Sequence, residues 1–210
     1  MRKKLTCKQW RMQVVAIGMI AVFAAISHVP PIRTSHAAEF DLEMALRPIA
    51  ARGAEEVAFE ERRFLGVVTE PLESSGTLRF EPPDRLIKKT GAPFRETAIV
   101  DKDRLTVLDG NGVETLSISL WASEELRLVF DSLRAVLRGD AAALRTLFDV
   151  SVSGSETEWT ISLMPKAAQD EGHIAEIIVW GVSGRIVSFD IRETNGDRAL
   201  IRLTGSVERS

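Results

Sequence analysis

The sequence predicts an α+β fold, mainly antiparallel β, in which an open half-barrel of about ten strands is covered by two or three helices. Short runs of alternating apolar and polar residues recur along the chain, which is the period of a half-buried strand. Asp-Gly and Asn-Gly turns between such runs indicate hairpins. One long helical stripe interrupts the runs, so a helix is expected to lie over a sheet face or an open barrel end.

The N-terminal segment has the three parts of a secretory signal. Five Lys and Arg residues precede an apolar run from Met12 to Ile26, and Ser35-His36-Ala37 places small residues at positions −3 and −1 of a cleavage site. The apolar run falls short of the roughly 20 residues that span a bilayer, which disfavours the alternative of an uncleaved membrane anchor. We therefore expect residues 1–37 to be a signal peptide and residues 38–210 to be the mature domain.

The composition of the mature domain excludes several kinds of site. The single cysteine, Cys7, leaves with the signal peptide, and His173 is the only histidine after residue 37. Disulfides, thiol nucleophiles, triads and His-rich metal sites are therefore disfavoured, and we expect no metal and no cofactor. Residues 1–37 hold six of the 27 Lys and Arg residues and none of the 30 acidic ones, so their removal lowers the net charge from −3 to −9. This charge disfavours nucleic acid and anionic membranes as partners.

The mature domain is expected to begin with a short helix. Asp41 can cap it, and Leu42, Leu46 and Ile49 fall on one face. Pro48 should end or kink this helix, because proline lacks the N–H that the helical ladder needs.

A first meander of strands follows. The strand that starts at residue 57 continues to residue 69, and a turn is expected from Pro71 to Gly76. Leu78 and Phe80 then share one face of the next strand, which Pro82-Pro83 ends because neither proline donates to a ladder. Further strands are expected at residues 86–90, 97–100, 105–108 and 113–120, with a hairpin turn at residues 109–112.

One long helix separates this meander from a second one. Ser123 caps the helix, acidic residues occupy its first turn, and Gly139 ends it. Its apolar stripe consists of Leu126, Val129, Phe130, Leu133, Val136 and Leu137, whereas Arg127, Arg134 and Arg138 lie off the stripe and should face water. A short helix is expected at residues 141–147. The second meander is expected at residues 148–152, 158–163, 174–180, 184–192 and 200–204.

Three segments carry motifs that occur together, in this order, in a known family. They are S-G-T-L-x-F-x-x-P-x-R-L at residues 75–86, Leu-x-Pro-Lys at residues 163–166 and the hairpin from Gly184 to Arg198. With these motifs the chain resembles the periplasmic carriers of outer-membrane lipoproteins, the LolA family. The resemblance implies a half-barrel with a helical lid, in the periplasm of a Gram-negative bacterium. It also implies an acylated lipoprotein or lipid cargo, an inner-membrane donor transporter and an outer-membrane acceptor, and we expect a monomer.

An apolar concavity is the expected binding site. Tyrosine is absent and histidine nearly so, which leaves an interior suited to acyl chains. Strand alternation predicts that the lining is made by Leu65, Val67, Leu78, Phe80, Leu86, Ile99, Leu105 and Val107. The long helix is the expected lid, and its contacts with the cargo are expected from Leu126, Val129, Phe130, Leu133 and Leu137.

One position departs from the pattern of the family. The resemblance implies an arginine immediately before the proline of the strand corner, where it holds the lid closed, and this chain has Pro82 there. Proline cannot donate such hydrogen bonds. We therefore expect Arg85 to be the polar tether and the resting lid to be looser than in the family.

Two other classes of function remain open from the sequence. An acyl-processing enzyme could use Asp101 with Asp103, or Glu193 with Asp197, as paired carboxylates. Both pairs fall in expected turns, where acidic residues are common for conformational reasons. A periplasmic sensor of envelope stress, which binds mislocalised lipoprotein and signals to a membrane partner, would share the fold. The main expectation is a non-catalytic carrier that passes its cargo toward the outer membrane.

Overall fold

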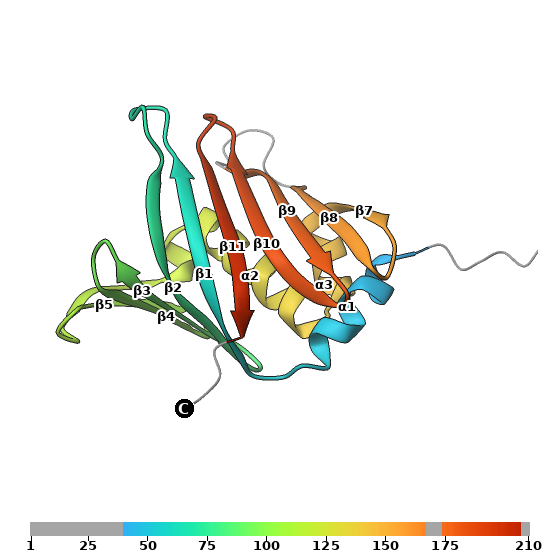
Figure 1. The fold of residues 1–210 in the computed structure, drawn as a ribbon, viewed down its shortest axis with the longest axis horizontal. Coiled ribbons are helices and arrows are strands. Elements are labelled where there is room, and N and C mark those ends of the chain that lie inside the picture. Colours follow the sequence, from blue (N-terminus) through green and yellow to red (C-terminus); the bar gives the residue numbers. More distant parts are fainter. Residues whose placement is uncertain (1–39, 167–173, 207–210) are drawn as a thin grey trace, which may run out of the picture. The chain divides into compact units, whose positions relative to one another are not determined.

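The computed structural model describes residues 40–166 and 174–206, and these ranges contain one antiparallel sheet of eleven strands and three α-helices (Figure 1). The predicted α+β class with an open half-barrel is confirmed. In chain order the elements are α1 (Leu42–Ala50), β1 (Glu55–Phe64), β2 (Leu72–Glu81), β3 (Arg85–Ala92), β4 (Glu96–Asp101), β5 (Arg104–Asp109), β6 (Glu114–Ser119), the 3-10 turn η1 (Leu120–Ala122), α2 (Glu124–Arg138), α3 (Ala141–Leu147), β7 (Phe148–Gly154), β8 (Glu158–Pro165), β9 (Ile174–Val182), β10 (Arg185–Glu193) and β11 (Arg198–Ser206).

The sheet consists of two meanders joined at its midline. The strand order is β6-β5-β4-β3-β2-β1-β11-β10-β9-β8-β7, so β6 and β7 are its edges and the described strands do not close a barrel. We call β1–β6 the N-terminal half of the sheet and β7–β11 its C-terminal half. The halves meet where β1 pairs with β11, with Glu61 opposite Ile201 and Phe64 opposite Arg198.

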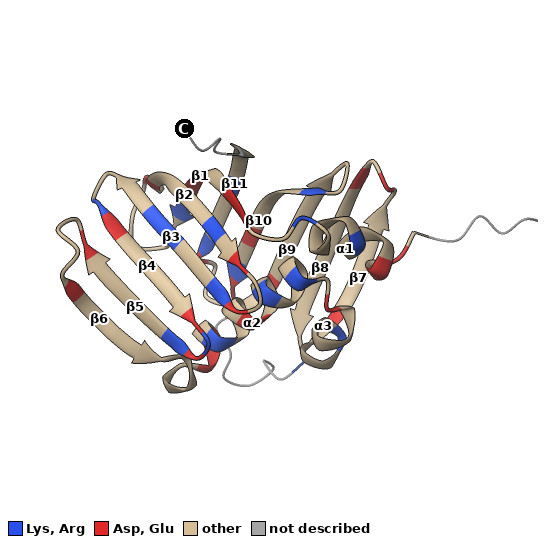
Figure 2. Cartoon of the chain, turned by 90° about the horizontal axis from the view of Figure 1, so that it is seen from below, with Lys and Arg blue, Asp and Glu red and all other residues tan. Residues whose placement is uncertain are grey.

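Helix α2 lies on the inner face of the curved sheet, between its two halves (Figure 2). Its N-cap is Ser123, whose hydroxyl accepts from the backbone N–H of Leu126, and it ends at Gly139, whose φ of 72° suits glycine. The stripe predicted from the sequence faces the sheet, and Leu133 and Leu137 contact the apolar clusters of both halves. The helix therefore bridges the two meanders from inside.

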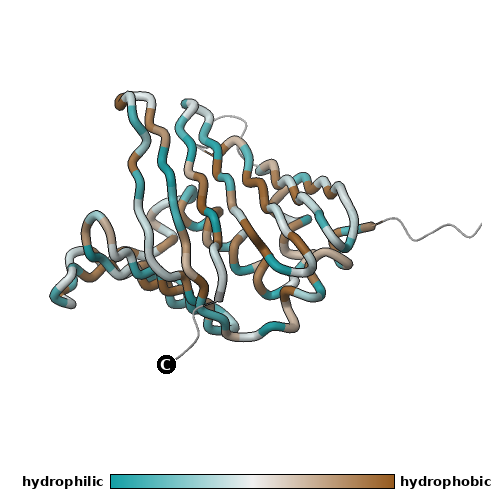
Figure 3. The backbone as a smooth tube through the Cα atoms, viewed as in Figure 1, coloured by the Kyte–Doolittle hydropathy of each residue, from teal (hydrophilic) through white to brown (hydrophobic). Residues whose placement is uncertain are grey.

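Hydrophobic and hydrophilic residues alternate along many of the strands (Figure 3). Because successive side chains point to opposite faces, this alternation gives the sheet an apolar inner face and a more polar outer one. In the C-terminal half the inner face packs against α1, α2 and α3 in a large cluster of buried side chains that includes Phe148, Trp159 and Leu163. In the N-terminal half the cluster is smaller and consists of Phe80, Leu86, Val100, Leu105 and Leu120.

The structure corrects two local predictions. Helix α1 continues through Pro48 to Ala50, since a proline at that position removes only one bond of a short ladder. Gly76 marks no turn but lies within β2, where a Cβ would come 1.8 Å from the carbonyl oxygen of Lys89 on β3. Close approach of two strands is therefore why glycine occupies this position.

Residues 1–39, 167–173 and 207–210 are outside the described ranges. The predicted signal peptide at residues 1–37 and His173, the one histidine after residue 37, fall there. Among the described residues no helix has the length and apolar character needed to cross a membrane.

Candidate functional site

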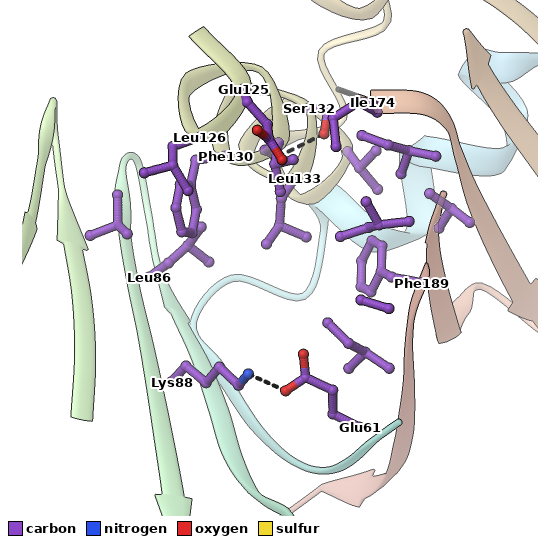
Figure 4. Close-up of a pocket in the computed structure, with 18 of the residues that line it drawn as sticks. Glu61, Leu86, Lys88, Glu125, Leu126, Phe130, Ser132, Leu133, Ile174 and Phe189 are labelled. Atoms are coloured by element: carbon purple, nitrogen blue, oxygen red, sulfur yellow. Dashed lines mark hydrogen bonds and ion pairs between the residues drawn. The ribbon is translucent and has the colours of Figure 1, made fainter. Parts of the chain in front are cut away.

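A cavity of about 220 Å³ lies between α2 and the inner face of the sheet (Figure 4). Most of the side chains around it are apolar, and they come from both halves of the sheet and from the helix. The lining residues are Glu61, Arg63, Leu78, Leu86, Lys88, Ala98, Val100, Glu125, Leu126, Val129, Phe130, Ser132, Leu133, Val136, Leu163, Ile174, Ile177, Val179, Phe189, Ile191, Glu193, Ala199 and Ile201. The fold therefore places a largely apolar chamber under its central helix.

A second cavity of about 120 Å³ adjoins the first. Leu78 on β2 and Phe189 on β10 line both cavities. The second one is also lined by Phe80, Leu137 and Ile49, so it extends under the C-terminal end of α2 toward α1.

Three of the strand residues predicted to line a concavity do so. Leu78 and Leu86 line the first cavity, and Phe80 lines the second. Leu105 and Val107 lie on the same face one strand further out, where they belong to the apolar cluster beneath the N-terminal part of α2 rather than to a cavity wall.

Three other predicted lining residues lie elsewhere. Strand β1 ends at Phe64, so Leu65 is half-buried in the loop to β2, and Val67 in the same loop is 91% exposed. Ile99 is paired with Ile87 on the opposite face of the sheet, and Val100 takes the cavity position. The prediction for Val67 was wrong because the predicted strand extended past Phe64, where β1 ends. The prediction for Ile99 was wrong because this side chain lies on the outer face of β4.

All five predicted lid residues face the cavities. Leu126, Val129, Phe130 and Leu133 line the first, and Leu137 lines the second. Phe130 and Leu133 project from α2 toward Leu86 and Phe189 in Figure 4.

Sequence reasoning missed a charged cluster in the cavity wall. Glu61 on β1 is 5% exposed, and it accepts from the ammonium of Lys88 on β3 and, at 3.0 Å, from the hydroxyl of Ser74 on β2. The Nε atom of Arg63 lies 3.3 Å from the other carboxylate oxygen, and the Lys88 ammonium lies 5.0 Å from the centroid of the Phe59 ring. Burial raises the pKa of Glu61, but the pairs with Lys88 and Arg63 outweigh it and hold this pKa below its ordinary value. The signal available in the sequence was a charged residue, Glu61, that continues the inner-face alternation of Val57 and Phe59 on β1.

Comparison with known families now adds to this geometry. The model of the family described as outer membrane lipoprotein carrier protein LolA-like matches residues 34–210. This chain belongs to the LolA-like family. The resemblance predicted from three motifs is therefore confirmed. No curated protein matches the sequence.

Solved structures similar to this LolA-like chain have low sequence identity. A LolA superfamily protein from Nitrosomonas europaea is 10% identical, with a TM-score of 0.43, over 82% of this chain and 95% of that chain. LprF from Mycobacterium bovis is 11% identical, with a TM-score of 0.39, over 80% of this chain and 94% of that chain. A chain of the Pseudomonas aeruginosa MucA/MucB complex is 13% identical, with a TM-score of 0.45, over 80% of this chain and 57% of that chain. The family assignment rests on the match over residues 34–210.

The polar tether of the helix in this LolA-like chain comes from the helix itself. Arg134 on α2 is 7% exposed, donates from Nε to the backbone oxygen of Asp84 at 2.9 Å, and donates from Nη2 to the backbone oxygen of Lys102. Arg138 adds an ion pair with the Asp84 carboxylate at 3.1 Å. These contacts join α2 to the β2–β3 and β4–β5 turns. The prediction that Arg134 faces water was therefore wrong.

Arg85, the predicted tether, points elsewhere. Its guanidinium bonds Glu81 at 3.0 Å and lies 4.0 Å from the Asp101 carboxylate, and its side chain is 44% exposed. Both partners belong to neighbouring strands rather than to α2. In the structure it is Arg134, rather than Arg85, that hydrogen-bonds α2 to the turns of the N-terminal half.

Proposed function

We propose that this protein is a periplasmic carrier that holds acyl chains of a lipoprotein or another lipidic cargo in the cavity under α2. In this proposal residues 1–37 direct export and are removed, the cargo comes from an inner-membrane donor, and it passes to an outer-membrane acceptor. Membership of the LolA-like family supports the carrier role. The apolar chamber between α2 and the sheet is the single observation that supports acyl binding most directly.

The strength of acyl burial suits a reversible carrier. At about 0.8 kcal/mol for each buried CH₂, a 16-carbon chain gains roughly 12 kcal/mol before costs are counted. Association costs at least about 4 kcal/mol, and displacing apolar contacts of α2 costs more. The remaining affinity is of a size that a membrane partner with its own apolar surface can reverse.

We propose binding rather than catalysis at this site. The carboxylates considered as catalytic pairs serve structural roles where their contacts are described. The Asp197 side chain accepts from the backbone N–H of Gly66 at 2.8 Å and so joins the β10–β11 turn to the loop after β1. The Asp101 carboxylate lies 4.0 Å from the Nε atom of Arg85 on the neighbouring strand β3. An assay for acyl-ester hydrolysis that found turnover dependent on these carboxylates would overturn this part of the proposal.

A matched pair of substitutions tests acyl binding. Leu78→Asp places a carboxylate on the wall shared by both cavities, and we expect a fluorescent 16-carbon fatty acid to bind at least about 10-fold more weakly, since a buried charge is desolvated. Val67→Asp makes the same kind of change at a side chain that is 91% exposed, and binding should be unchanged. Equal binding by the folded Leu78→Asp protein would contradict the proposal. N-terminal sequencing of the exported protein tests the cleavage after residue 37.

A further inference from the structure

The charged cluster of the cavity wall has more positive than negative charge. Lys88 and Arg63 both contact the one carboxylate of Glu61. Among the described residues, no acceptor other than Glu61 bonds the Lys88 ammonium, and the two terminal nitrogens of Arg63 have no hydrogen-bond partner. Donors of charge-assisted hydrogen bonds therefore remain open beside an apolar chamber.

The cluster also has a defined position in that chamber. The side chain of Glu61 is 6% exposed, that of Lys88 31% and that of Arg63 61%, so exposure rises along the cluster from the interior to solvent. Arg63 lies one residue before the end of β1. Lys88 and Glu61 lie on the wall of the cavity opposite α2, and the apolar lining residues surround the space between them and the helix (Figure 4). The arrangement is that of an apolar chamber whose wall holds a cluster of two cations and one carboxylate.

We propose that Lys88 and Arg63 form a subsite for an anionic headgroup, a carboxylate or a phosphate ester, of an amphiphile whose acyl chain lies under α2. Glu61 positions both cations, and its own carboxylate is held by them and by Ser74. This inference rests on the proposed function and adds to it the chemical class of the cargo. The acyl chain supplies affinity, and the headgroup sets the direction in which the cargo enters.

Two further carboxylates line the cavity and define the competing outcome. Glu125 lies in the first turn of α2, where the positive end of the helix dipole offsets its charge, and Glu193 accepts from the side-chain amide of Asn195 at 3.4 Å. Neither forms an ion pair with Lys88 or Arg63 among the described contacts. A cationic headgroup would use these carboxylates instead, so the test includes one.

Three 16-carbon amphiphiles that differ in the headgroup test the subsite. Binding of hexadecanoate, hexadecanol and hexadecyltrimethylammonium is measured by displacement of a fluorescent fatty acid below their micellar concentrations. We expect the mature protein to prefer hexadecanoate over hexadecanol by about 10-fold, the size of a charge-assisted hydrogen bond. Hexadecyl phosphate in parallel distinguishes a phosphate from a carboxylate headgroup. The preference should fall as salt rises if it is electrostatic.

Matched variants assign the preference to these two cations. Arg63→Gln and Lys88→Met should bring the ratio of the two affinities close to one, mainly because hexadecanoate binding becomes weaker. Arg62→Gln and Lys89→Met alter the neighbouring cations, whose side chains lie on the other face of the sheet, and should keep the preference. If Lys88→Met fails to fold because Glu61 loses its partner, Arg63→Gln decides, since its mostly exposed side chain tolerates replacement.

The outcomes separate this inference from the proposed function. Equal binding of hexadecanoate and hexadecanol overturns the anionic subsite and leaves acyl binding standing. Tighter binding of hexadecyltrimethylammonium overturns it in favour of Glu125 and Glu193. If none of the three binds, both the proposed function and the subsite fall.

Discussion

The two halves of the sheet are built from the same kind of meander but are covered very differently. In the described residues the C-terminal half shares sixteen buried apolar side chains with the three helices, whereas the cluster of the N-terminal half has five. Helix α1 contacts β10 and α3 contacts β7, so both helices pack mainly against the C-terminal half. The apolar cluster of the N-terminal half is formed with side chains of α2 and η1.

This difference assigns separate roles to the two halves. The C-terminal half with α1 and α3, which we call the platform, is the more closely packed part, and its inner face also forms one wall of the first cavity. The N-terminal half meets α2 through a thin apolar layer and through the two arginine contacts to its turns. We therefore expect movement of α2 away from the N-terminal half to cost less free energy than movement away from the platform. The first cavity lies between α2 and the two halves of the sheet.

The largest expected effect tests the difference in packing directly. Phe148 is 1% exposed in the platform, and Phe80 is 7% exposed in the N-terminal cluster, beside the second cavity. We expect Phe148→Ala to lower the free energy of unfolding by about 4 kcal/mol, and Phe80→Ala by about 2–3 kcal/mol because part of its surroundings is already open space. Urea denaturation of the two variants measures both values. Equal losses would mean that the two halves are equally well packed.

A smaller effect is expected at the contact between α2 and the N-terminal turns. Arg134→Met removes the two hydrogen bonds to backbone oxygens but keeps an apolar stem. We expect it to lower the free energy of local opening of α2 by about 2 kcal/mol. Amide hydrogen exchange should become faster in α2 and stay unchanged in β8 and β9.

Arg127→Met is the control on the same helix. The guanidinium of Arg127 stacks over the ring of Trp121 at 4.7 Å, and it bonds neither turn among the described residues. We expect its effect on exchange in α2 to be small. Exchange in α2 as slow in Arg134→Met as in the unchanged protein would show that apolar packing alone holds the helix.

The smallest expected effect lies within the platform. The Arg145 guanidinium on α3 donates to the Glu43 carboxylate on α1, at 2.9 Å for Nη2, and this hydrogen bond lowers the pKa of Glu43 to about 2 from 4.5. The pair is on the surface, so Glu43→Gln should cost less than about 1 kcal/mol at neutral pH. A carboxylate whose pKa is lower in the folded chain stabilises it above pH 4.5, and this contribution is lost as the pH falls toward 2. Unfolding curves of both proteins should therefore converge in acid, and a constant difference would exclude the pair as its cause.

Sequence periodicity predicted the platform better than the site. The strands of the C-terminal half and the stripe of α2 follow from clear alternation and helical spacing, and Ser123 and Gly139 define the ends of the helix. Val67 was misplaced because Leu65 to Thr69 continues the apolar run of β1, although the chain turns after Phe64. The strand ends at Phe64 because its pairing with β2 and β11 ends at residues 63 and 64. The local sequence does not indicate where that pairing stops.

The polar parts of the site depend on contacts between distant residues. Glu61 and Lys88 meet diagonally across β2, since Glu61 is paired with Ser74 and Lys88 with Leu78, four residues further along that strand. Arg134 finds the carbonyl groups of two turns that belong to other strands. Neither contact has a local sequence pattern, so both required the fold to be seen.

The pairing of β1 with β11 also fixes the order in which this chain can fold. Each meander is a series of neighbouring hairpins that can form from local contacts, but the seam between them joins the first strand to the last. Non-local pairings of this kind form late and slowly, because bringing distant segments together costs chain entropy before the new contacts stabilise them. Until then the inner edges of both meanders, β1 and β11, have unpaired backbone groups, which makes the unfinished chain a target for strand exchange and aggregation. The last strand to be synthesised is thus the one that completes the sheet.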